Sequence, residues 1–191
     1  MANSLRYIQL ENRLKSIETL YLPPIKSSGN YNKKEQDNLR AYLLLVHAEI
    51  ESFFEEIAEE KAKKAFKNWK TNRTKSNILL SLVSFCSIEK NENSIECRVN
   101  KSLTTYINSL KKNNGIKDNN ILNILLPIGY EFQDIDTTWL NTISSFGSSR
   151  GEVAHKASKV QQPLDPATLK STVTYVLSEM KTIDENLKKI L

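Results

Sequence analysis

The chain has 191 residues, of which 39% are hydrophobic and 26% charged, a composition that indicates a folded globular domain and excludes a disordered chain. No apolar stretch approaches the roughly 20 residues of a membrane-spanning helix, and charged residues stand where a signal peptide would be apolar. The net charge of +5 favours an acidic partner such as nucleic acid. Cys86 and Cys97 fit neither a disulfide framework nor a zinc spacing, so we expect free thiols, no membrane and a reducing cytoplasm.

Glycine and proline are scarce, with five residues of each where average usage would give about thirteen glycines. Neither residue occurs between Gly29 and Gly115. A β protein would need a turn about every 8–12 residues. The chain is therefore predicted to be all-α.

Apolar residues recur at alternating spacings of three and four, which marks one buried face of a helix. We predict helices at about 3–21, 33–68, 75–87, 98–112, 119–126, 137–158 and 166–190. The second helix has the widest apolar face and is expected to lie centrally. Asp165 is predicted to cap the last helix, with Pro166 at its first position, and a disturbance is expected at Gly147–Gly151.

The motifs of many enzyme classes are missing. The sequence contains no glycine-rich phosphate loop, no HExxH and no GxSxG. Its two histidines, His47 and His155, nearly exclude an imidazole metal site, and we expect neither a metal nor a cofactor. His47 is expected to be half-buried near an interface, and Glu49 and Glu51 to be solvated helix surface.

Arg150 and His155 form an R-x4-H pair in the segment SSFGSSRGEVAHKASK. A histidine titrates near neutral pH and can move a proton in either direction. An arginine clamps a phosphate with a planar fork of donors and neutralises charge in the transition state. Such a pair could cleave RNA without metal, using the 2′-hydroxyl of the RNA as nucleophile. Residues five apart on a helix differ by about 140° around its axis. For both side chains to reach one site, Arg150 must use its length or Gly151 must loosen the helix.

Two segments resemble the HEPN superfamily of all-helical domains, whose nucleases carry an R-x4–6-H motif near the start of a late helix. The motif matches Arg150-Gly-Glu-Val-Ala-His155. The segment LRAYLLLVHAEIESFFEEIAEE, 39–60, is similar to the early helix of the RiboL-PSP and MAE-type groups. The resemblance covers about 33–191 of a single domain spanning 1–191, with 1–30 as an extension. Gly151 stands where many family nucleases have Asn, Asp or His after the arginine.

The resemblance implies an all-α, HEPN-like helical bundle acting as a metal-independent endoribonuclease. It implies a homodimer with the two motifs facing each other, often a toxin or an antiviral-defence effector restrained by an antitoxin or regulatory protein. Arg150 and His155 would be catalytic. By position, Lys156, Lys159 and Ser149 are candidates for RNA contact, and Glu152 and Glu49 are weaker supporting candidates.

The segment 61–75 carries seven basic residues and no acid, interrupted by Phe66 and Trp69. It could follow an RNA backbone, or its charges could reflect a helix C-terminus and its aromatic residues packing. The serines at 144–149 could likewise donate to phosphate or cap a helix. Two alternatives to the nuclease remain: a non-catalytic HEPN module for dimerisation or partner binding, and a nucleotide-binding regulator using the same basic cleft.

Overall fold

The computed structural model describes residues 3–86, 94–155 and 162–190, and only the backbone of His155. Within these ranges the chain is helical and contains no strand, which confirms the predicted all-α class. The elements, in order, are α1 (Leu5–Tyr21), α2 (Lys33–Asn72), α3 (Asn77–Phe85), α4 (Ile95–Lys111), α5 (Asp118–Leu125), η1 (Leu126–Ile128), η2 (Phe132–Asp134), α6 (Thr137–His155) and α7 (Pro166–Leu187).

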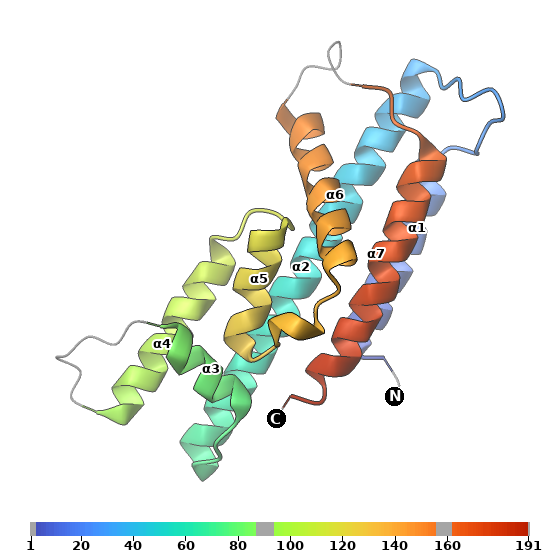
Figure 1. Cartoon of the computed structure of the whole chain (residues 1–191). Coiled ribbons are helices and arrows are strands. Elements are labelled where there is room, and N and C mark those ends of the chain that lie inside the picture. Colours follow the sequence, from blue (N-terminus) through green and yellow to red (C-terminus); the bar gives the residue numbers. More distant parts are fainter. Residues whose placement is uncertain (1–2, 87–93, 156–161, 191) are drawn as a thin grey trace.

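The 40-residue helix α2 forms the axis of the molecule (Figure 1). It contacts α1, α3, α4, α5, α6 and α7, as its wide apolar face predicts. Helices α1 and α7 lie together on one side of α2, and α3, α4 and α5 lie on the other. The single long helix therefore packs against nearly every part of the core.

A chain of aromatic rings fixes α6 against this axis. Phe54 lies 5.4 Å from Phe53 and 6.1 Å from Trp139 of α6, measured between ring centroids. Trp139 is fully buried, and its indole Nε1 donates a hydrogen bond of 3.2 Å to the carbonyl of Val176 in α7. Buried aromatic pairs combine a large apolar area with a preferred geometry, so α6 has a defined position on α2.

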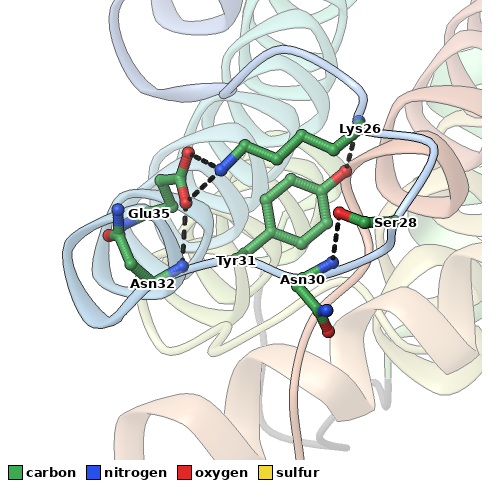
Figure 2. A network of polar contacts seen from close by, with 6 residues as sticks. All are labelled: Lys26, Ser28, Asn30, Tyr31, Asn32 and Glu35. Carbon is green, nitrogen blue, oxygen red and sulfur yellow. Dashed lines mark hydrogen bonds and ion pairs between the residues drawn. The ribbon is translucent and has the colours of Figure 1, made fainter.

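The turn between α1 and α2 is held by polar contacts (Figure 2). The Asn32 side chain accepts a bond of 2.9 Å from the Glu35 N–H, and the Glu35 carboxylate accepts one of 2.8 Å from the Asn32 N–H. This reciprocal capping box satisfies backbone donors that the first turn of a helix leaves open. Lys26 donates to the same carboxylate at 2.8 Å and lies over the ring of Tyr31.

Most predicted helix boundaries agree with the structure to within about three residues. Helix α2 continues four residues beyond the predicted end, to Asn72, and stops at Arg73, whose φ of 54° is left-handed. Asp165 caps α7 with Pro166 at its first position, as predicted. Pro127 does not simply end α5, because the chain continues into the 3-10 turn η1.

The predicted disturbance at Gly147–Gly151 is wrong. Helix α6 is continuous from Thr137 to His155. A glycine inside a helix costs about 1 kcal/mol relative to alanine, and burial of one helix face against neighbours offsets such a cost. Ile143 and Phe146 of α6 are buried in the core directly before Gly147 and supply that burial.

None of the helices in the described ranges has the length and hydrophobicity that a membrane span requires.

Candidate functional site around Arg150

Arg150 lies near the end of α6 and is partly buried. The helix ends toward the same pole of the molecule as the start of α2, away from the chain termini (Figure 1). His155 lies five residues further along the same unbroken helix, and its side chain, Lys156 and Lys159 lie outside the described residues. Because α6 stays regular through Gly151, the loosened-helix explanation for a shared site is wrong. Residues five apart on a regular helix differ by about 140° around its axis.

His47 is buried beneath this end of α6, with only 1% of its surface exposed. Burial, and to a smaller extent the positive charge of Arg150, lowers its pKa from 6.5 to about 4. The imidazole is therefore neutral at pH 7. The expectation of a half-buried histidine is wrong, because the side chain is enclosed within its own chain.

A polar cluster surrounds His47, and we call it the Glu51 cluster. It comprises His47, Glu51, Glu55, Asn113, Gly115 and Asn120. The Glu51 carboxylate accepts a hydrogen bond from the Gly115 N–H and one of 3.3 Å from Asn113 Nδ2, and it lies 3.7 Å from His47 Nδ1. Asn113 also donates to Glu55 at 2.8 Å, and burial raises the pKa of Glu55.

The Glu51 cluster fixes the loop 112–117 between α4 and α5. Asn120 donates to Asn113 at 2.8 Å, which closes the loop against the start of α5. Gly115 adopts a φ of 124°, a backbone conformation that L side chains rarely adopt. Glu51 is therefore an anchor for this loop, and the expectation that it is merely solvated surface is wrong.

The anchored loop packs directly on α6, one helical turn before Arg150. A Cβ on Gly147 would lie 3.4 Å from both Ile116 Cγ1 and Lys117 Cγ. Ser144 donates to Asp118 at 3.4 Å on the same side. Helix α2, the loop and α6 thus meet around one polar centre next to Arg150.

The family model described as RiboL-PSP-HEPN matches residues 8–189. The chain belongs to this HEPN family. In comparisons with curated proteins and with solved structures, nothing matches the chain.

The structure shows where three other candidate residues of this HEPN chain lie, namely Ser149, Glu152 and Glu49. Ser149 donates to the carbonyl of Ser145 at 3.1 Å and lines a groove of about 620 Å³ between α6 and the start of α7. Glu152 is exposed on α6. Glu49 lies on another face of α2 and binds Arg13 Nε at 3.0 Å, which connects α2 to α1.

The serines at 144–149 lie inside α6 and do not cap its start. Ser145, Ser148 and Ser149 each donate to the carbonyl four residues earlier, at 2.9–3.1 Å. The capping interpretation is therefore wrong for these serines. Their oxygens retain lone pairs as acceptors, while their hydroxyl protons are used within the helix.

The aromatic residues of the segment 61–75 pack against the HEPN fold. Trp69 is 8% exposed and contacts Leu79 and Val99 in a small satellite core. Phe66 packs at its edge, and the Arg73 guanidinium lies 4.8 Å from the Trp69 ring centroid. The packing interpretation of these two aromatic residues is confirmed.

Among the described residues, no group of three or more His, Cys, Asp and Glu side chains could hold a metal ion.

The role of the loop 112–117 is not predicted by the sequence. The run Asn113, Asn114 and Gly115 indicates the end of a helix. It gives no sign of the partly buried Glu51 carboxylate that accepts hydrogen bonds from Asn113 and Gly115. The one signal available was Glu51 itself, since it stands four residues after His47 on one helix face.

Proposed function

We propose that this HEPN protein is a metal-independent endoribonuclease whose catalytic groups are Arg150 and His155. The observation that carries the proposal is the R-x4-H segment, on one continuous helix, in a chain that belongs to a HEPN family. A charge-bearing arginine at a helix end beside an anchored loop suits the binding of a phosphodiester.

In the proposed reaction, His155 accepts the proton of an RNA 2′-hydroxyl. The 2′-oxygen then forms a bond to the adjacent phosphorus, and the bond from phosphorus to the 5′-oxygen breaks. Arg150 holds the non-bridging oxygens and stabilises the charge that gathers on them. A proton delivered to the leaving 5′-oxygen completes the step and gives a 2′,3′-cyclic phosphate and a 5′-hydroxyl.

A homodimer belongs to the same proposal, because one arginine and one histidine are few for a complete site. Two motifs facing each other would supply one histidine as base and the other as acid. Such an enzyme fits the role of a toxin or antiviral-defence effector that a protein partner restrains.

The test is cleavage of labelled single-stranded RNA and tRNA by the purified chain in EDTA. We expect cleavage by the wild type and a loss of about 10²- to 10⁴-fold in His155→Ala and in Arg150→Ala, because each removes a proton-transfer or phosphate-binding group. The products should carry 2′,3′-cyclic phosphate ends.

Lys181→Ala, at an exposed lysine in the later part of α7, serves as the control, provided that all variants show the same circular dichroism. Equal cleavage by wild type and His155→Ala would overturn the assignment of the base. If no RNA is cut by any of them, the non-catalytic HEPN module for dimerisation or partner binding takes the place of the nuclease.

A further inference from the structure

Lys117 is the first residue before α5 and stands against the helix that carries Arg150. Its Cγ and its backbone nitrogen would lie 3.4 and 3.5 Å from a Cβ on Gly147. Gly147 and Arg150 are three residues apart, so they occupy neighbouring positions on one face of α6, about 4.5 Å apart along the axis. The stem of Lys117 therefore runs beside the turn that presents Arg150.

The position of Lys117 is fixed by the two residues that precede it. Its neighbour Ile116 is fully buried, and Gly115 is bound through its N–H to the carboxylate of Glu51. The three residues form one short loop whose inner side is anchored and whose outer side carries the lysine. A side chain held in this way loses less conformational freedom on binding than one on an unrestrained loop.

Lys117 is also available to bind an anion. It is exposed and makes no ion pair within the described part of the chain. The nearest acid in sequence, Asp118, accepts a hydrogen bond from Ser144 of α6. Lys111 and Lys112, at the end of α4, are exposed on the same connection and add positive charge.

We propose that Lys117 is a second cationic contact for the RNA backbone, binding a phosphate beside the one held by Arg150. The inference rests on the proposed ribonuclease function and assigns part of its substrate binding to the loop between α4 and α5. Lys117 takes no part in proton transfer. It orients the strand across α6, and its loss acts on substrate binding rather than on the chemical step.

The test measures binding of a 2′-O-methyl single-stranded RNA, which has no free 2′-hydroxyl and is not cut, over a range of salt concentrations. For single strands, each phosphate contact contributes about 0.7 to the slope of log affinity against log salt. We expect Lys117→Ala to reduce the slope by about 0.7 and Lys117→Arg to restore it. With cleavable RNA, Lys117→Ala should raise KM and leave kcat nearly unchanged.

Lys181→Ala is the matched control, because Lys181 is an exposed lysine in the later part of α7, which runs away from the pole where α6 ends (Figure 1). An unchanged slope in Lys117→Ala, or an equal change in Lys181→Ala, overturns the assignment of Lys117 while the nuclease stands. A wild type that neither binds nor cuts RNA overturns the nuclease and this inference together.

Discussion

The protonation state of His47 follows from its burial. An imidazolium at this buried position loses its hydration, and the positive Arg150 disfavours it further. The neutral form can accept or donate one hydrogen bond within the cluster at no such cost. His47 is thus a structural residue at pH 7, although it lies close to the candidate site.

This burial predicts a pH-dependent stability. The folded pKa of about 4 lies below the ordinary value of 6.5, so the unfolded chain binds more protons between these values. The contribution of His47 is fully present above pH 6.5 and is lost as the pH falls toward 4. We expect the free energy of unfolding to fall by about 2 kcal/mol between pH 7.5 and pH 5 from this residue alone.

Urea unfolding at the two pH values measures the effect, with His47→Gln as the reference because glutamine does not titrate. The pH dependence of the variant should be weaker than that of the wild type by the stated amount. Equal pH dependence in both proteins would show that His47 does not carry this acid sensitivity.

At the scale of one element, α2 combines a local start signal with a tertiary environment that determines its length. Its capping box and apolar stripe are local features, and both are visible in the sequence. Its final turn is held by contacts of Trp69 and by ion pairs of Lys70 and Arg73 with Glu96 of α4. Local patterning therefore predicts where α2 begins more accurately than where it ends.

The capping box predicts the effect of a substitution at the start of α2. Replacing Asn32 by alanine removes the acceptor for the Glu35 N–H, and we expect a loss of about 1 kcal/mol in the free energy of unfolding. The shift of the urea midpoint at constant slope gives the value. Asn30→Ala is the matched control two residues earlier, expected to stay within about 0.5 kcal/mol. Equal losses in the two variants would contradict the role assigned to the cap.

At the scale of the whole molecule, packing gives α6 a defined position, with its final turns at one pole. The core beneath α6 is formed by α2 and α7, so the motif helix is supported along most of its length. A site assembled at this pole can be completed by another copy of the chain. The dimer therefore belongs to the functional proposal and needs its own measurement.

Light scattering of the purified protein should give twice the 21.9 kDa mass of the chain. If the site needs both copies, cleavage per chain should fall on dilution below the dissociation constant of the dimer, because monomers carry half of the catalytic set. A monomeric mass combined with full activity that does not depend on concentration would overturn the homodimer and leave the Arg150–His155 pair to act alone.

The sequence by itself determined the helical class, most helix boundaries and the R-x4-H segment, because breakers, caps and apolar periodicity are local properties. It also determined the resemblance that the family model confirms over residues 8–189. Only the tertiary structure decided that Glu51 anchors Gly115, that His47 is enclosed and that Lys117 lies against Gly147. These contacts join residues 64 positions apart in one case and 30 in another. No local sequence pattern predicts these contacts, since they arise only when α2, the loop and α6 pack together.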